Sequence, residues 1–186
     1  TPPGSDPWGV VVDSNGNLIS SDWITGKIYI HDGISSTITN SFSSPGSSPF
    51  GVAVDSNNNL ISGDGTTDTI YVHQGISSTI TNSFSIPNSV GIEGFTIDSN
   101  DNLISSTPNT VNFDNLYIHD GISSTITNSF KNIGRKGITV NSNGDLINSL
   151  IRIYSGISDT VKNSFPNSLN NPRGLTIDSN ENLIVV

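Results

Sequence analysis

The chain has 186 residues, with 16 Asp and Glu against seven Lys and Arg, which gives a net charge of -9. This charge argues against a nucleic-acid partner, because a protein that binds phosphate backbones needs basic surface to displace their counterions. The chain has no cysteine, which excludes disulfides and thiolate chemistry, and no apolar run approaches the ~18 residues of a membrane-spanning helix.

Composition also bears on where the protein works. The sequence begins at Thr1 and contains no methionine, so we expect a processed chain or a piece of a longer one. Its polarity comes from Ser, Thr, Asn and Gly, because charged residues make up only 12% of the chain. Such a composition is typical of exported proteins, and we expect an extracellular or cell-surface location.

The first part of the chain is predicted to form four short strands. β-branched residues fill Val10–Val12, and Ser14–Asn17 has the residues of a tight turn. In Lys27–His31 the isoleucines alternate with Tyr29 and His31, as in a strand with two different faces. No window has the apolar spacing of an amphipathic helix. The strands that we expect, in an antiparallel meander, are Val10–Val12, Leu18–Ile19, Lys27–His31 and Thr37–Thr39.

The same unit recurs along the chain. The segment GISSTITNSF begins at Gly33, at Gly75 and at Gly121, and a diverged copy, GISDTVKNSF, begins at Gly156. A second landmark is a glycine followed by an apolar run and a turn; its copies begin at Gly9, Gly51, Gly94, Gly137 and Gly174. Copies this alike indicate a tandem array. We expect a single domain, 1–186, with repeats at approximately 7–48, 49–91, 92–134, 135–171 and, in part, 172–186.

The length and strand count of the unit match one blade of a β-propeller. From Gly9 to Gly51 the chain advances 42 residues and contains four expected strands. Each sheet has apolar residues on both faces, and blades stacked around an axis bury both. We therefore expect an all-β fold, a β-propeller of four-stranded antiparallel blades with four full repeats plus a half repeat. A β-sandwich or β-solenoid built from the same units is the alternative.

The start of each unit resembles a known family. The quoted segments are Pro7-Trp8-Gly9, Pro49-Phe50-Gly51, Pro172-Arg173-Gly174 and the turn Asp13-Ser14-Asn15-Gly16-Asn17-Leu18. With the Lys-Ile-Tyr-Ile strand that follows, this pattern resembles NHL-repeat propellers and is similar to streptogramin-lyase-like and lactonase-like propellers. The resemblance covers almost the whole chain and implies a propeller architecture. It implies no single activity, because such propellers host unrelated functions.

The fifth repeat is incomplete, since it ends after two strands at Leu183–Val186. The residues before Trp8 are too few and too rich in proline and glycine to supply two more strands. Three arrangements are open: a five-bladed ring with a half blade, a fragment of a larger propeller, and a ring completed by another chain. Open blades expose strand edges and apolar faces, so we expect a fragment or an assembly that self-associates through its open blade ends.

The turn after the first strand superficially resembles a calcium loop. Asp13, Asn15 and Asn17 alternate as oxygen ligands would, but Leu18 and Ile24 stand where an EF-hand loop requires Gly and Glu. Asp and Asn also favour tight turns by bonding to their own backbone. We therefore expect a turn and no metal.

Three histidines share one repeat position, His31, His73 and His119, with Ser155 expected to replace them in the fourth copy. In a propeller these side chains would belong to separate blades and would not converge on one ion. We therefore expect them to pack or to form hydrogen bonds, and we expect no cofactor.

The copies differ most where a ligand would bind. The residue before each inner-strand glycine would border the mouth of the central channel, a common place for ligands. The loops between the second and third strands also vary, and variable loops on a fixed scaffold often carry function; they are Ser21–Gly26, Gly63–Thr69 and Ser105–Asn115. The candidate ligand-binding residues are Trp8, Trp23, Phe50, Glu93, Lys136 and Arg173.

Enzyme motifs are mostly absent, with no Gly-x-Ser-x-Gly elbow, phosphate loop or His-Glu-x-x-His pair. We therefore expect no catalytic residues and a non-enzymatic extracellular or cell-surface propeller, a binding or structural module for a protein or glycan ligand. Two alternatives stay open. One is a propeller-type lactonase- or lyase-like enzyme, which would hold a divalent ion near Glu93, and the other is a filament or assembly subunit.

Overall fold

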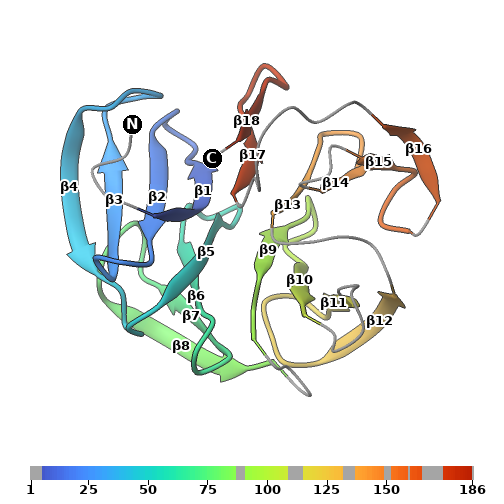
Figure 1. The fold of residues 1–186 in the computed structure, drawn as a ribbon, viewed down its shortest axis with the longest axis horizontal. Helices are drawn as coiled ribbons and strands as arrows, with labels where there is room; N and C mark the ends of the chain where they lie inside the picture. The colour runs from blue at the N-terminus through green and yellow to red at the C-terminus, as the bar shows by residue number, and fades with distance from the viewer. Residues whose placement is uncertain are drawn as a thin grey trace.

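The computed structural model describes residues 6–86, 91–108, 115–131, 137–148, 152–158, 160–164 and 174–185. All the regular structure in these ranges is β-strand, arranged as four antiparallel four-stranded sheets and one two-stranded sheet (Figure 1). The expected all-β fold is confirmed. Within the same ranges no helix is long and apolar enough to cross a membrane.

The strands of each sheet follow chain order from the inside outward. The first sheet is β1 (Pro7–Val12), β2 (Leu18–Asp22), β3 (Lys27–His31) and β4 (Ile38–Ser43), and the second is β5 (Pro49–Val54), β6 (Leu60–Asp64), β7 (Thr69–His73) and β8 (Ile80–Ser85). The third is β9 (Gly94–Ile97), β10 (Leu103–Thr107), β11 (Asn115–His119) and β12 (Ile126–Lys131). The fourth is β13 (Ile138–Val140), β14 (Leu146–Asn148), β15 (Arg152–Tyr154) and β16 (Val161–Ser164), and the fifth is β17 (Leu175–Ile177) and β18 (Leu183–Val185).

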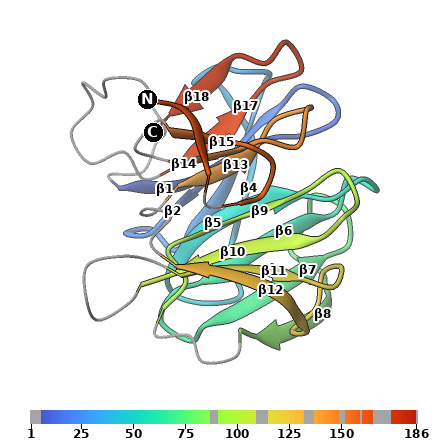
Figure 2. The same cartoon turned by 90° about the vertical axis from the view of Figure 1, so that its right-hand side faces the viewer.

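The five sheets are blades of one ring, which confirms the propeller. The inner strands β1, β5, β9, β13 and β17 surround a common channel, and β17 packs against both β13 and β1 (Figure 1). The inner strands of the half blade and of the four full blades therefore form one ring. In the view turned by 90°, the third sheet lies against the second (Figure 2).

Apolar cores between neighbouring blades hold the ring together. Between the first two blades, Ile19, Ile28 and Ile30 pack against Val52 and Leu60. Equivalent cores lie between the second and third blades and between the third and fourth blades. The second and third sheets thus bury apolar side chains on both faces, as the stacking of two-faced blades requires.

One of these cores is built around a large ring. Phe95 opens the third inner strand, where the other four blades have Val10, Val52, Ile138 and Leu175. A Cβ atom added to Gly63, on the preceding blade, would lie 2.6 Å from Cε1 of Phe95. Gly63 replaces the serine that the first and third blades have at this position, so it supplies the space that the phenyl ring fills.

The histidines are internal hydrogen-bonding groups, as expected. In each of the first three blades a serine Oγ lies within hydrogen-bond distance of a histidine Nε2: Ser20 and His31 at 3.0 Å, Ser62 and His73 at 2.8 Å, and Ser105 and His119 at 2.9 Å. All three histidines are at most 1% exposed. Burial is the main cause that lowers the pKa of each imidazole below its ordinary value.

The fourth blade carries a different pair, and here the expectation from the sequence is wrong. His31 pairs across the sheet with Ile38, and Tyr154 pairs in the same way with Val161. Tyr154, not Ser155, therefore occupies the histidine position. The partner serine is replaced as well, since Asn148 donates from Nδ2 to the Tyr154 hydroxyl at 3.0 Å. The buried hydrogen bond persists, with an amide and a phenol hydroxyl in place of the serine hydroxyl and the imidazole.

The turns that end the inner strands act as turns, as expected. Asp13 accepts hydrogen bonds from the backbone N–H groups of Asn15 and Asn17, and Asp55, Asp98, Asn141 and Asp178 bond in the same way in the other blades. The fourth turn residue has a φ between 59° and 81° in every blade; these residues are Gly16, Asn58, Asp101, Gly144 and Glu181.

Where that fourth residue has a polar side chain, it joins two blades. Its oxygen accepts the N–H of the serine in the preceding blade's turn, in the pairs Ser14 and Asn58, Ser56 and Asp101, and Ser142 and Glu181. We call this contact the turn clasp. Gly16 and Gly144 have no side chain to form it. Two of the five seams between blades therefore lack this contact.

Candidate ligand site at the channel mouth

The channel has two different ends. Its middle, of about 150 Å³, is lined by three residues from each of the five inner strands. Toward the starts of these strands the cavity beside Trp8 and Phe50 has a volume of only about 20 Å³, and we call this the aromatic end. Toward the turns that begin with Asp13, Asp55 and Asp178 it widens to about 420 Å³, and we call this the turn end.

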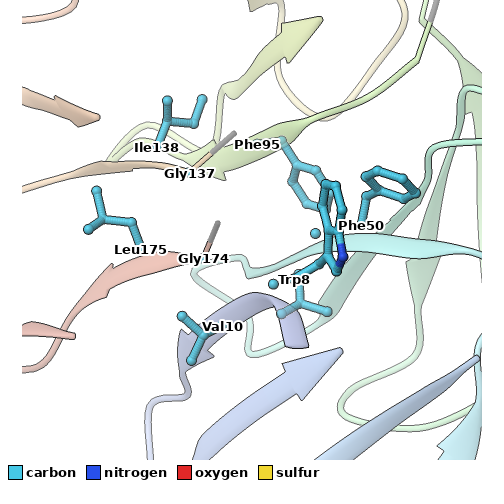
Figure 3. Close-up of a pocket in the computed structure, with 12 residues that line it drawn as sticks. Trp8, Val10, Phe50, Phe95, Gly137, Ile138, Gly174 and Leu175 are labelled. Carbon is cyan, nitrogen blue, oxygen red and sulfur yellow. The ribbon is translucent and has the colours of Figure 1, made fainter. Parts of the chain in front are cut away.

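Two of the predicted site residues meet at the aromatic end. Trp8 on β1 and Phe50 on β5 have ring centroids 4.2 Å apart with the planes inclined by 56°, a favourable arrangement for aromatic rings. Phe95 extends the group on the same side of the opening, and Ile138 and Leu175 line the other side (Figure 3). The three rings come from three neighbouring blades, so the ring of inner strands assembles them.

A pair of aspartates positions the tryptophans. The carboxylate of Asp22 accepts the N–H of Asp6 at 3.0 Å, the N–H of Thr25 at 2.7 Å and the Thr25 hydroxyl at 2.8 Å. Burial alone would raise the pKa of the Asp22 carboxyl, but these donors together hold it below its ordinary value. Asp6 in turn accepts the indole N–H of Trp8 and the backbone N–H of Trp23, each at 3.1 Å.

Trp23 is the exposed member of the group. Its side chain is 41% exposed and that of the adjacent Ile24 is 59% exposed, in the loop between β2 and β3. Large apolar side chains that are held in place yet open to solvent are characteristic of binding surfaces. Trp8 contacts Phe50, and Asp6 bonds both to the Trp8 indole and to the Trp23 backbone; we call Trp8, Phe50 and Trp23 together the aromatic surface.

The other predicted site residues do not join this surface. Glu93 is half-buried, its backbone N–H donates to the carbonyl of Ser106 at 3.0 Å, and it does not line the channel mouth. Lys136 and Arg173 lie outside the described residues. The sequence analysis did not select Asp6 or Asp22 as site residues, because their role depends on contacts with the backbone of other segments.

Charge is distributed unequally between the two ends. Nine described carboxylates lie at the turn end, namely Asp13, Asp32, Asp55, Asp98, Asp101, Asp120, Asp145, Asp178 and Glu181. Lys162 lies with them and binds Asp145 at 2.8 Å. The N–H of Gly156 and the Lys162 ammonium hold the pKa of Asp145 below its ordinary value. Most of the negative charge therefore lies away from the aromatic surface.

Near the channel mouth, the described residues include few groups that could bind a metal ion or act as an acid or a base. Within the described ranges no group of three or more His, Asp or Glu side chains is placed to hold a metal. The three histidines end their strands toward the turn end and are bonded to serines. Asp22 and Asp64 are buried acceptors for the backbone of their own loops.

Comparison with known proteins supports the fold. Neither a protein-family model nor a curated protein sequence matches the chain. Among solved structures it is similar to the WD40 β-propeller domain of Doa1, with 16% identity and a TM-score of 0.62 over 91% of this chain and 57% of that one. It is also similar to a virginiamycin B lyase from Staphylococcus aureus, with 15% identity and a TM-score of 0.62 over 98% and 63%.

A structure of a streptogramin B lyase is similar as well, with 16% identity and a TM-score of 0.62 over 96% of this chain and 61% of that chain. The chain thus spans about three fifths of the length of each of these structures. The resemblance to streptogramin-lyase-like propellers that the sequence indicated is confirmed as a likeness of fold.

Proposed function

We propose that the chain is a non-enzymatic binding module that works outside the cell or at its surface and holds a protein or glycan ligand on the aromatic surface. One observation carries the proposal: the rings of Trp8 and Phe50 contact each other at the channel mouth, while Trp23, whose backbone N–H binds the carbonyl of the same Asp6, is exposed. Tryptophan is enriched at binding hot spots because its ring offers a large contact area at little cost in side-chain entropy.

The polar groups around this surface fit binding better than catalysis. A catalytic acid or base must be free to exchange a proton with the substrate. The Asp22 carboxylate is instead occupied by three donors, and the Asp6 carboxylate accepts the indole N–H of Trp8. Such groups fix side chains in place before a ligand arrives, which reduces the entropy lost on binding.

The experiment compares three single substitutions, Trp8→Ala, Phe50→Ala and Trp23→Ala, on a glycan array and in pull-down from surface extracts. We expect each substitution to weaken binding at least tenfold, since hot-spot aromatics contribute about 2 kcal/mol or more. Ile80→Ala is the matched control, because Ile80 is also a partly exposed apolar residue but lies on the outer strand β8. Binding that survives all three substitutions would refute the proposal.

A lyase-like or lactonase-like enzyme is the second candidate, and the likeness to two lyase structures favours it. It would hold a divalent ion near Glu93, the acid that precedes the inner strand β9. Calorimetric titration with Mg²⁺ and Ca²⁺ tests this candidate. Heat of binding that is lost in Glu93→Gln would support the enzyme, whereas silent titrations would reject it.

A further inference from the structure

We propose that an asparagine on each outer strand keeps the open edge of its blade from pairing with strands of other polypeptides. The outer strands of the complete blades are β4, β8, β12 and β16. The four asparagines, which we call the edge guards, are Asn40, Asn82, Asn128 and Asn163. They lie on the rim of the propeller and not at the channel mouth, so the inference does not depend on the proposed function.

The rim has an open strand edge on every complete blade. Among the described strands, each outer strand pairs with a neighbour on one side only, so the backbone groups of its other side face outward (Figure 1). Such an edge is a template for strand addition and aggregation, and proteins usually block it with proline or with charged side chains. The strands β4 and β8 contain neither. These two edges therefore require another kind of protection.

Strand register identifies the backbone groups that face outward. The N–H of Ser44 donates to the carbonyl of Gly26 at 2.9 Å, so these two residues form a hydrogen-bonded pair. Three residues earlier, Ser41 lies opposite Tyr29. Hydrogen-bonded and non-hydrogen-bonded pairs alternate along antiparallel strands, so the N–H of Ser41 points away from β3. The second blade has the same register, and the N–H of its Ser83 points outward as well.

Each edge guard occupies this outward N–H from within its own strand. Its Oδ1 atom accepts the N–H of the serine that follows it, at 2.8 Å in all four complete blades; the pairs are Asn40 and Ser41, Asn82 and Ser83, Asn128 and Ser129, and Asn163 and Ser164. The four asparagines are exposed, so water could satisfy the same N–H groups without them. An incoming strand would have to place a carbonyl oxygen where Oδ1 lies. It would therefore have to break this bond before it could pair.

Differences among the copies point to the same residue. The outer hairpin of the fourth blade has diverged, and Val161 and Lys162 stand where the other three copies have isoleucine and threonine. The next two residues, Asn163 and Ser164, are unchanged and form the same bond. An exposed residue that is kept beside substituted neighbours has a role for its side chain, and the bond at the strand edge supplies that role.

The first experiment measures hydrogen exchange of backbone amides by NMR, with each rate corrected for its neighbouring residues. The N–H of Ser43 faces the same edge as that of Ser41, but it follows Phe42, whose side chain has no oxygen to accept it. We expect the Ser41 N–H to exchange at least about threefold more slowly than the Ser43 N–H, and Asn40→Ala to remove this difference. Equal exchange of the Ser41 N–H in the wild type and in Asn40→Ala would overturn the proposal.

The second experiment replaces all four edge guards with alanine in one chain and follows its association by sedimentation velocity and thioflavin T fluorescence. We expect this fourfold variant to associate at a concentration about tenfold lower than the wild type does, because its edges are open to strand addition. The matched control replaces the four following serines with alanine, which keeps both the acceptor and the N–H, and it should behave as the wild type. Aspartate in place of the four edge guards keeps an acceptor oxygen and should also behave as the wild type in high salt, which screens its charge.

Two results of the second experiment would overturn the proposal. One is a fourfold alanine variant with native circular dichroism that associates at the same concentration as the wild type. The other is equal association of the asparagine and serine variants, because that result assigns the effect to the loss of exposed polar side chains and not to the guard bond. If the fourfold variant does not fold, the exchange rates of the single variant Asn40→Ala decide the question.

Discussion

Acid should unfold this propeller in a pH range that its histidines set. In the second blade, His73 donates from Nδ1 to the carbonyl of Ser77 at 2.6 Å, so its Nε2 accepts from the hydroxyl of Ser62. A second proton on the ring would break this arrangement inside a core. Burial lowers the pKa of all three imidazoles below the ordinary 6.5. Just below pH 6.5, the histidines of the unfolded chain therefore bind more protons than those of the folded chain.

The sign and size of the effect follow from linkage. Stability from the neutral histidines is fully present above pH 6.5 and is lost as the pH falls below it. Each proton taken up only by the unfolded chain changes the unfolding free energy by about 1.4 kcal/mol per pH unit, so three histidines together approach about 4 kcal/mol per unit. A domain is commonly stable by only about 5–15 kcal/mol. The carboxyls with lowered pKa, Asp22, Asp145 and Asp178, act separately, below about pH 4.

Urea unfolding followed by tryptophan fluorescence at several pH values between 7.5 and 5 measures this slope. The fourth blade supplies the matched control, since its Asn148–Tyr154 pair keeps the hydrogen bond without an imidazole. Copying that pair into the second blade, as Ser62→Asn with His73→Tyr, should reduce the slope by about a third. His73→Gln provides a second variant if the tyrosine does not fit. A slope that stays at the wild-type value in both variants would refute the reasoning.

Three further predictions concern the seams and the loops. Gly63→Ser should destabilise the fold by about 1–3 kcal/mol in urea unfolding, because its Cβ would meet Phe95, and Phe95→Val should restore most of the loss; destabilisation that persists in the double variant would contradict this account. Gly144→Asn should exceed Gly144→Ala in stability by at least about 1 kcal/mol, since asparagine tolerates a positive φ better than alanine and only asparagine can form a clasp with Ser99; equal melting temperatures would argue against it. Asp22→Ala should lower the unfolding free energy by about 1–3 kcal/mol and shift the tryptophan emission, and an unchanged spectrum would separate Trp23 from this anchor.

Much of this fold was readable from sequence because each blade is specified locally. Alternating residues such as Ile28 and Tyr29 define the two faces of a strand, and the repeated glycine of the outer hairpin fixes its turn. The third strand is confirmed residue for residue at Lys27–His31, and the fourth, expected at Thr37–Thr39, begins one residue later and extends to Ser43. The sequence of a single blade does not determine whether β17 packs against β1. That contact depends on the sum of the rotation angles between successive blades around the ring.

The features that sequence reasoning missed depend on contacts between distant residues. Ser155 was expected at the histidine position, whereas strand pairing places Tyr154 there. The compensating change is Asn148, which belongs to another strand. Asp6 could not be recognised from the sequence, because the contact that reveals its role is made by its backbone N–H, which donates to the carboxylate of Asp22 16 residues away. In each case one residue makes sense only with its spatial partner.

The two ends of the ring differ in the contacts that their residues make between blades. At the turn end a residue such as Asp101 serves its own turn and clasps Ser56 of the preceding blade, so a change there weakens two structures at once. At the aromatic end the described residues before the inner-strand glycines are Trp8, Phe50 and Glu93, and none of these three belongs to a turn clasp. A surface that can vary without opening the seams between blades is the one on which ligand recognition can develop, and the aromatic surface lies there.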